Sequence, residues 1–284
     1  MRSSQNLFNI LKIYESFGIT EHIGINDIIN NLNKSLLIVH NEPNVNQIED
    51  FHNDSSPQPV INSEYIVPVT TKQKSIPAIN PLPAIDFSFL NVIHSLDDLK
   101  ESLINFQGCD SLKERAMNTV MGSGNPNANI MLIGEAPGAE EDEQGIPFVG
   151  RSGKLLIKAL SSIGILRENV YITNTVFWRP TGNRNPSQLE IDTCYPFVKK
   201  IIELVNPKII LLIGSIATKS IIEGNLPISQ LIKKWYTIPI DNNNYAVRVL
   251  YHPAYLLRNP SQKKILWEEL LEVKHKILEM NLKV

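Results

Sequence analysis

Short apolar runs alternate with amphipathic stretches throughout residues 91–284, and this alternation constrains the fold more than any other feature. Strands that alternate with helices form βαβ units, in which helices cover both faces of a mainly parallel sheet. The expected strands are 129–134, 170–176, 208–213 and 245–251, and the expected helices are 152–164, 187–205, 215–223 and 261–280. The sequence therefore predicts an α/β fold: a three-layer α/β/α sandwich around a short, mostly parallel four-stranded sheet.

The N-terminal third has a different character. Residues 7–18 place apolar side chains at helical spacing and end at Gly18, so we expect a short helical segment within residues 1–40. Residues 41–90 combine seven prolines with many Asn, Ser, Gln and Thr residues. Such a composition buries too little apolar surface to offset the entropy of ordering. We therefore predict a disordered linker over 41–90, followed by a catalytic domain over 91–284.

The cysteine count and the apolar runs limit the class of protein. Only Cys109 and Cys194 are present, which excludes a disulfide framework and any metal site that needs four thiolates from one chain. No apolar run approaches the roughly 20 residues that span a bilayer, and the N-terminus lacks the features of a secretory signal. These observations predict a protein of the reduced cytoplasm that does not enter a membrane.

Charge is distributed unevenly along the chain. The net charge is −2, yet residues 199–284 carry 13 basic and seven acidic side chains. A basic C-terminal third is able to meet phosphate groups. A solvated helix surface explains the same pattern, and charge alone favours that interpretation.

Polar, aromatic and glycine-rich loops follow all four predicted strands. They contain residues 134–150 after the first strand, Asn174 and Arg184 after the second, Ser215 after the third and His252 after the fourth. Because ligands of open α/β sheets bind outside the carboxyl ends of the strands, these loops should meet at one site. The first loop has neither Gly-x-Gly-x-x-Gly nor Gly-Lys-Ser/Thr, which disfavours a dinucleotide or P-loop site.

Three side chains in these loops suit recognition of a nucleobase, and each also has a structural interpretation. Phe148 is either a core residue or a platform on which a base stacks. Asn174 offers a donor and an acceptor for a base edge, or it caps a turn. His252 is able to stabilise negative charge on a ligand carbonyl, although a lone histidine is more often structural.

Together these stretches resemble the uracil-DNA glycosylase superfamily, most closely its family 4 enzymes. The resemblance lies in 134–156, in 170–174 with 179–184, and in 252–258, which follow the family's order and intervals. It covers approximately residues 105–280. It implies an enzyme of base excision repair that flips uracil out of DNA and hydrolyses its N-glycosidic bond. The products would be free uracil and an abasic site.

The resemblance also implies roles for individual residues in a uracil pocket. Phe148 would stack on the base, Asn174 would read its O4 and N3 edge, and His252 would approach O2. Glu135 and Ala136 would supply the backbone beside the base and the catalytic water. The implied uracil-binding set is Gly134, Glu135, Ala136, Glu141, Phe148, Asn174 and His252, of which Glu135, Asn174 and His252 are the catalytic candidates.

DNA contacts are expected outside this pocket. By the same resemblance, Leu256, Leu257 and Arg258 would form the segment that wedges into the duplex when uracil leaves the stack. Arg184 and the helix N-terminus at Ser215 are candidates for phosphate contacts, because backbone N–H groups at a helix start attract anions.

Two departures from the family pattern bear on its chemistry. Typical family 4 enzymes hold an iron–sulfur cluster with four cysteines, but here only Cys109 and Cys194 stand at such positions, with Phe106 and Trp178 at the other two. Two thiolates cannot hold a four-iron cluster alone. We therefore expect no cofactor and no metal, with the two aromatic side chains filling the space as an apolar plug.

The second departure concerns the catalytic water. Other branches of the superfamily place an Asp where this chain has Ala136, so Glu135 and Glu141 are the candidates for activating water. Two alternatives follow: a glycosylase specific for G·U mismatches, or a catalytically weak DNA-binding or replication-associated module on the same fold. An unrelated α/β hydrolase is disfavoured because the chain contains no Gly-x-Ser-x-Gly. The expected partner is uracil-containing DNA, the expected state a monomer, and residues 1–90 are a candidate segment for recruiting a repair partner.

Overall fold

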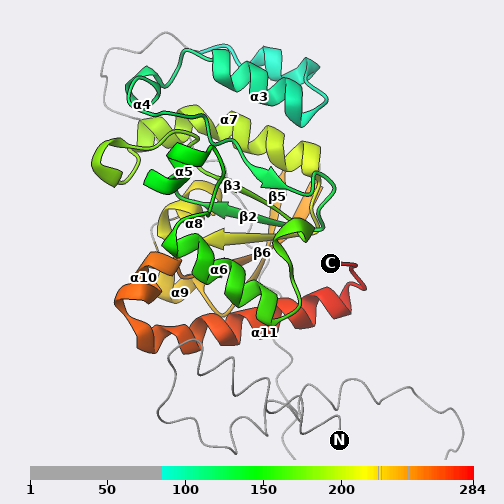
Figure 1. Cartoon of the computed structure of the whole chain (residues 1–284). Coiled ribbons are helices and arrows are strands. Elements are labelled where there is room, and N and C mark those ends of the chain that lie inside the picture. Colours follow the sequence, from blue (N-terminus) through cyan, green and yellow to red (C-terminus); the bar gives the residue numbers. More distant parts are fainter. Residues whose placement is uncertain (1–84, 223, 225, 242) are drawn as a thin grey trace, which may run out of the picture. The chain divides into compact units, whose positions relative to one another are not determined.

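The computed structural model describes residues 85–284 except positions 223, 225 and 242 (Figure 1). The predicted N-terminal helix and nearly all of the predicted linker lie outside the described residues. The last residues assigned to the linker are described, and they belong to the packed domain: the 3₁₀-helix η1 (Ser88–Val92) begins there, and its Leu90 is buried in the core. The packed domain therefore begins before residue 91.

The sheet confirms the predicted fold class but has six strands instead of four. Its order is β1-β3-β2-β4-β6-β5. The four predicted strands form its parallel centre, and two antiparallel strands were missed at the edges. The strands are β1 (Ser123–Gly124), β2 (Ile130–Gly134), β3 (Val170–Asn174), β4 (Ile209–Ile213), β5 (Trp235–Ile240) and β6 (Asn243–Leu250).

Both edge strands lack the short, continuous apolar run from which the central strands of the sheet are predicted. β1 is only two residues long, too short for any periodicity. β5 alternates between more and less buried side chains, and it contains Pro239. Proline within a sheet is found mainly in edge strands, because it has no N–H to donate to a neighbouring strand. By contrast, every residue of β2, β3 and β4 is buried, as expected for strands with both faces covered.

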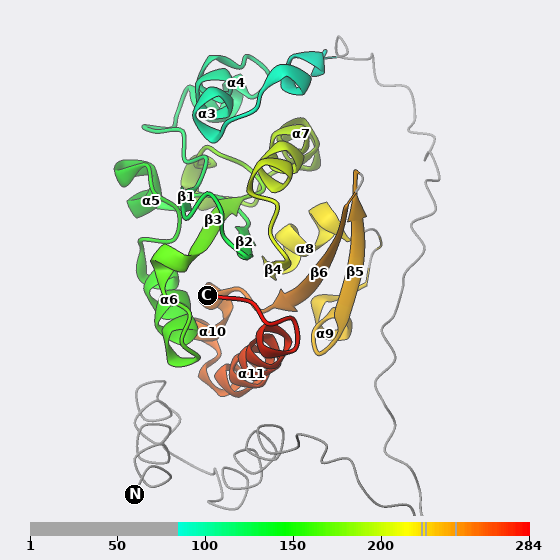
Figure 2. The same ribbon diagram turned by 90° about the vertical axis from the view of Figure 1, so that its right-hand side faces the viewer.

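Helices cover the sheet on both faces (Figures 1 and 2). On one face α3 packs on α7 and α7 on α8, and on the other α6 contacts α10 and α11. None of the helices within the described part of the chain is long and apolar enough to cross a membrane. The helices are α3 (Leu96–Asn105), α4 (Asp110–Lys113), α5 (Ala139–Gln144), α6 (Arg151–Ser162), α7 (Gln188–Val205), α8 (Ser215–Ile221), α9 (Ile228–Leu231), α10 (Pro253–Arg258) and α11 (Lys263–Glu279).

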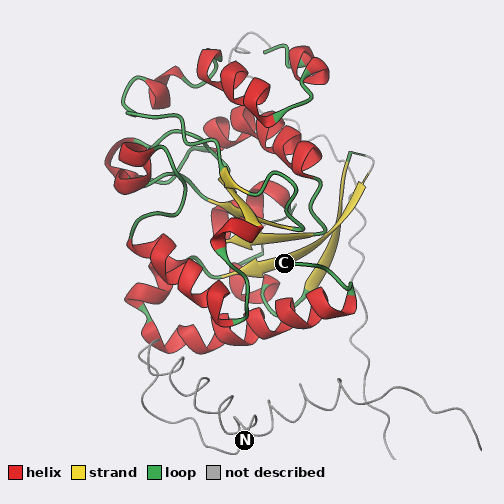
Figure 3. Cartoon of the chain, turned by 45° about the vertical axis from the view of Figure 1, so that its right-hand side comes forward, coloured by secondary structure: helices red, strands yellow, loops and turns green. Residues whose placement is uncertain are grey.

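The register of the central strands brings their carboxyl ends to one edge. Gly134 at the end of β2 pairs with Asn174 at the end of β3, and Ile213 at the end of β4 pairs with Leu250 at the end of β6. The loops and short helices that follow these strands therefore lie next to one another, as the secondary-structure view in Figure 3 shows. This edge is where the candidate site is found.

A buried ion pair fixes the long last helix to the sheet. Arg248 on β6 donates from Nε to Oε2 of Glu269 on α11 at 2.6 Å, and both side chains are almost fully buried. The Arg248 guanidinium also lies 5.3 Å from the ring centroid of Trp235 on β5. Burial raises the pKa of Glu269, while the arginine opposes that shift.

Candidate active site

A cavity of about 770 Å³ opens at the carboxyl edge of the parallel strands. Residues that follow β2, β3, β4 and β6 all contribute to its wall, which confirms that the loops meet at one place. The predicted residues that line it are Glu135, Ala136, Glu141, Phe148, Asn174, Arg184, Ser215, His252 and Arg258.

Asn174 contributes a buried hydrogen-bond acceptor to the cavity. Its side chain is 1% exposed, and its Oδ1 has no hydrogen-bond partner among the described residues. An unsatisfied buried acceptor costs roughly 1–3 kcal/mol, so proteins seldom keep one without a use. Because the residue lines the cavity, a ligand N–H is the natural partner of this oxygen.

Gly134 leaves the space that Asn174 and Phe148 occupy. A Cβ atom at position 134 would collide with Oδ1 of Asn174 and would lie 2.6 Å from Cζ of Phe148. Gly134 does not line the cavity itself. Its contribution is the missing side chain, which lets an amide and a phenyl ring approach the end of β2.

Phe148 is held in a left-handed backbone conformation, with φ of 54°, and its side chain is 7% exposed. Such a conformation is costly for a residue with a side chain, so other contacts must impose it. Arg167 supplies two of them, because it donates to the carbonyl of Pro147 at 2.5 Å and to that of Phe148 at 3.2 Å. The centroid of the Phe148 ring lies 6.2 Å from that of the His252 ring.

Glu141 fastens two parts of the first loop together. Its Oε2 accepts a hydrogen bond from the backbone N–H of Gly138 at 3.1 Å. Its Oε1 accepts from Val149 at 3.0 Å and from Gly150 at 2.8 Å. With three backbone donors on one carboxylate, Glu141 positions the segment that carries Phe148. This geometry favours a positioning role over the water activation considered for it.

Glu135 follows β2 directly and lines the cavity beside Ala136. Its backbone carbonyl accepts from Oγ1 of Thr175 at 2.6 Å, which ties the first loop to the segment after β3. Burial raises the pKa of the Glu135 carboxyl group. A carboxylate with a raised pKa in a cavity suits general-base chemistry on a water molecule.

His252 is the N-cap of α10, and this position defines its hydrogen bonding. Its Nδ1 accepts from the backbone N–H of Ala254 at 3.2 Å. A neutral imidazole that accepts at Nδ1 carries its proton on Nε2. Burial, together with the smaller effect of the positive charge of Arg258, lowers the pKa of His252 to about 4. The side chain is therefore a neutral Nε2–H donor at physiological pH.

Two of the predicted DNA contacts are exposed beside the cavity, and one is wrong. Arg258 and Ser215 are exposed. Leu257 is half-buried, whereas Leu256 is fully buried in the core. Leu256 therefore cannot wedge into DNA from this conformation, because α10 turns its side chain inward.

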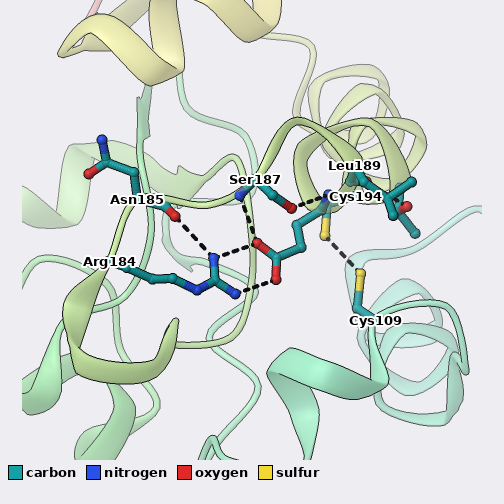
Figure 4. A network of polar contacts seen from close by, with 8 residues as sticks. Cys109, Arg184, Asn185, Ser187, Leu189 and Cys194 are labelled. Atoms are coloured by element: carbon teal, nitrogen blue, oxygen red, sulfur yellow. Dashed lines mark hydrogen bonds and ion pairs between the residues drawn. The ribbon is translucent and has the colours of Figure 1, made fainter. Parts of the chain in front are cut away.

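Arg184 lies at the cavity rim with its side chain 46% exposed. Its guanidinium binds both carboxylate oxygens of Glu190, at 2.8 and 2.6 Å, and the carbonyl of Asn185 at 3.0 Å (Figure 4). The hydrogen bonds from Arg184 hold the pKa of Glu190 at about 2. Glu190 also accepts from the backbone of Ser187 as part of the predicted capping box.

The positions related to the iron–sulfur cysteines hold two thiols and two aromatic side chains. The sulfur atoms of Cys109 and Cys194 lie 3.6 Å apart in direct hydrogen-bond contact, and both thiols are buried (Figure 4). The hydrogen bond with Cys109, together with burial, raises the pKa of the Cys194 thiol well above its ordinary value. The same hydrogen bond lowers the pKa of the Cys109 thiol, so Cys194 is the partner that stays protonated. Because the thiolate is the form that binds metal, the protonated Cys194 thiol is a poor metal ligand.

Aromatic side chains fill the rest of this region. The Phe106 ring packs 4.9 Å from that of Phe197, centroid to centroid. Trp178 is buried and donates from Nε1 to Oγ1 of Thr119 at 3.0 Å. Within residues 85–284 as described, no group of three or more His, Cys, Asp or Glu side chains is placed to hold a metal ion. The residues present therefore do not fit a four-iron cluster.

Comparison with known proteins gives the family. Residues 121–271 match the sequence profile of the Uracil DNA glycosylase superfamily, and the chain belongs to it. A Type-4 uracil-DNA glycosylase of Sulfurisphaera tokodaii is 40% identical over 185 residues, which cover 63% of this chain and 84% of that protein. Type-4 uracil-DNA glycosylases of Archaeoglobus fulgidus and Thermotoga maritima are 38% and 41% identical, over 61% and 55% of this chain and 88% and 82% of theirs.

Several residues of the site escaped sequence reasoning. Tyr251 precedes His252 in the chain and Tyr255 follows it, and both line the cavity. Arg167 holds the Phe148 loop from a distant segment. The two tyrosines lie within or next to a stretch that carries the family resemblance, so their position was the available signal. The loop contact of Arg167 has no sequence signal, because its partners are backbone carbonyls.

Proposed function

We propose that this protein is a uracil-DNA glycosylase that flips uracil out of DNA and hydrolyses its N-glycosidic bond. The observation that carries the proposal is the buried Oδ1 of Asn174, which has no partner among the described residues and lines the cavity. Membership of the superfamily and the Type-4 relatives support the same conclusion.

Asn174 gives the cavity a basis for choosing uracil. The N3–H of uracil supplies the donor that Oδ1 lacks, and the side-chain amide is then free to donate to O4. Cytosine has no hydrogen on N3 and carries an amino group at C4, so it presents the opposite pattern. A buried amide left unpaired by the wrong base rejects that base strongly.

His252 stabilises the departing base. As the bond between C1′ and N1 breaks, negative charge develops on uracil, and a donor near O2 lowers the energy of that state. A neutral Nε2–H provides this donor without a proton transfer, and removal of one such donor typically costs about 10²–10³ in rate. Phe148 stacks on the base and holds it in place.

Glu135 is the candidate for activating the water that adds to C1′. Its raised pKa and its place beside the base-binding residues support this role. The products are free uracil and an abasic site. Extrusion of the base costs a few kcal/mol, which is least for a mispaired or single-stranded uracil.

The DNA strand is held by groups around the cavity. We assign phosphate contacts to Arg184, Arg258 and the helix start at Ser215, and the wedge to Leu257 in place of Leu256. A monomeric state, a cytoplasmic location and recruitment of a partner by residues 1–90 stay predictions.

The protein functions without an iron–sulfur cluster. The contact between Cys109 and Cys194 and the packing of Phe106 and Trp178 support this. Iron and sulfide analysis of protein purified without oxygen tests it, together with the visible absorption spectrum. We expect neither stoichiometric iron nor a cluster band, and stoichiometric iron in active protein would contradict the assignment.

The activity is tested on a labelled oligonucleotide with one uracil, by the alkali-labile break that an abasic site produces. We expect cleavage by the parent protein and a strong loss with Asn174→Ala and His252→Ala. Asn127→Ala and His275→Ala remove the same residue types from exposed positions and should retain full activity. Tight DNA binding without any uracil release would favour the catalytically weak binding module, and release from G·U duplexes alone would favour the mismatch-specific enzyme.

A further inference from the structure

Two tyrosines in the cavity have no role in the mechanism above. Tyr251 follows β6 directly, and Tyr255 lies on α10. Their ring centroids are 5.0 Å apart with an interplanar angle of 41°, and both residues are half-buried and line the cavity. Half-buried aromatic rings at a cavity wall, in contact with each other, form a surface on which a flat ligand is able to stack.

The tyrosine pair lies at a different end of the sheet edge from the uracil-recognising amide. Asn174 and Phe148 come from the segments after β3 and β2, whereas the tyrosines follow β6, and β4 separates β6 from β2. His252 lies near both groups. Its ring centroid is 6.2 Å from that of Phe148, and Tyr251 precedes it in the chain. A cavity of about 770 Å³ is also larger than a single pyrimidine requires.

Other groups near the tyrosines suit a nucleotide. Ile216 at the start of α8 lines the same cavity, and it is placed next to β6 because Ile213 pairs with Leu250. Arg258 is exposed on the same helix as Tyr255 and offers a cation for a phosphate. A flat apolar surface with a neighbouring cation is the pattern by which proteins bind single-stranded nucleic acid.

The substrate itself supplies the ligand. When uracil occupies the pocket beside Asn174, the adjacent nucleotide is covalently held within one backbone unit of it. Its effective concentration near the cavity rim is therefore high. We propose that Tyr251 and Tyr255 form a stacking site for the base next to the excised uracil. This proposal rests on the proposed uracil-DNA glycosylase function. A base that stacks here has left its own partner, so the site favours uracil in single-stranded DNA.

The test compares oligonucleotides that differ only beside the uracil. One has ordinary bases on both sides, and two carry a stable abasic residue on the 5′ or the 3′ side. Uracil release is measured for the parent protein, Tyr251→Leu, Tyr255→Leu and the ring-preserving Tyr251→Phe and Tyr255→Phe. The dissociation constant of each oligonucleotide, made with a non-hydrolysable uridine analogue, is measured in parallel by fluorescence anisotropy.

We expect the leucine variants to bind ordinary single-stranded DNA about 5- to 150-fold more weakly, with the loss in KM rather than kcat. Removal of one of the two neighbouring bases should weaken DNA binding by the parent protein by a similar factor. It should not weaken DNA binding by the leucine variants any further. The phenylalanine variants should behave like the parent. Because the rings are half-buried, thermal unfolding of the leucine variants should stay close to that of the parent.

Two results would overturn the stacking site. One is a leucine variant that binds and cleaves ordinary DNA as the parent does. The other is a loss of the same size on all three oligonucleotides, which would show that the rings only support the fold. Absence of uracil release by the parent protein would instead refute the proposed activity, and the binding measurements would still decide whether a neighbouring base is recognised.

Discussion

Gly134 and Asn174 are paired residues at the ends of the parallel strands β2 and β3, and the missing side chain of the glycine makes room for the amide of the asparagine. The same empty space accommodates the ring of Phe148, whose Cζ would lie 2.6 Å from a Cβ at position 134. One glycine therefore permits both groups that are proposed to recognise uracil.

Gly134→Ala is expected to abolish most uracil release, because the added methyl group must displace the amide, the ring or both. A shift of about 1 Å in such groups is able to cost about 10²-fold in rate. Gly164→Ala is a matched control, because a Cβ there meets nothing within 4 Å, although its positive φ adds some strain. Single-turnover assays of the two variants would contradict this interpretation if they showed equal rates.

The dependence of the rate on pH should report Glu135 and not His252. Burial raises the pKa of Glu135, so its base form is lost as the pH falls through that raised value. The pKa of His252 is about 4, so it stays neutral across the same range. Glu135→Gln should lower the rate by about 10²–10⁴ and remove the acid limb of the pH–rate profile. An unchanged acid limb in this variant would exclude Glu135 as the base.

His252 should also make stability depend on pH. Its pKa is about 4 in the folded state and about 6.5 in the unfolded chain, so between these values the unfolded chain binds the proton more strongly. The contribution is fully present above pH 6.5 and is lost as the pH falls toward 4, up to about 3 kcal/mol. Denaturant unfolding measures the free energy of unfolding at pH 5 and at pH 7.5. The difference between these two values should be larger for the parent protein than for His252→Gln. Equal differences would mean that the imidazole is not desolvated.

Glu141→Gln tests the clamp on the Phe148 loop. The two carboxylate oxygens accept from three backbone N–H groups, and a glutamine amide would direct its own N–H groups toward some of these donors. We expect a loss in kcat/KM of at least tenfold and weaker inhibition by free uracil, because the stacking ring loses its support. Glu143→Gln is the control, since that side chain is exposed on the same helix. If both variants matched the parent in uracil inhibition, the clamp would not position the ring.

The sequence predicted the centre of the fold because the parallel strands are short, wholly buried runs separated by amphipathic helices. It missed β1 and β5 because edge strands satisfy fewer constraints and leave weaker patterns. The sequence correctly places 252–258 at the sheet edge. It also predicts Leu256 as a DNA contact, whereas this side chain is buried. A helix as short as α10 has too few turns for its periodicity to reveal which side is buried.

The site was predictable in its composition and not in its contacts. The resemblance identified Phe148, Asn174 and His252, all of which line one cavity. It did not reveal that Oδ1 of Asn174 is buried without a partner, or that Glu141 binds three backbone donors. These facts depend on where side-chain oxygens lie relative to hydrogen-bond donors in the folded chain, which residue types alone do not determine.

The buried ion pair of Arg248 and Glu269 should be required for stability and dispensable for catalysis. Removal of one partner leaves the other charge buried, which typically costs about 3–5 kcal/mol. We therefore expect Glu269→Ala to lower the free energy of unfolding by that amount, because the buried Arg248 guanidinium then loses its carboxylate partner. The double variant Arg248→Met/Glu269→Leu replaces the pair with apolar groups of similar size and should recover most of the loss. Urea denaturation measures the free energy of unfolding of both variants. Uracil release well below the melting temperature should be unchanged, since neither residue lines the cavity. A double variant no more stable than Glu269→Ala would show that the pair contributes specific stabilisation beyond its packing.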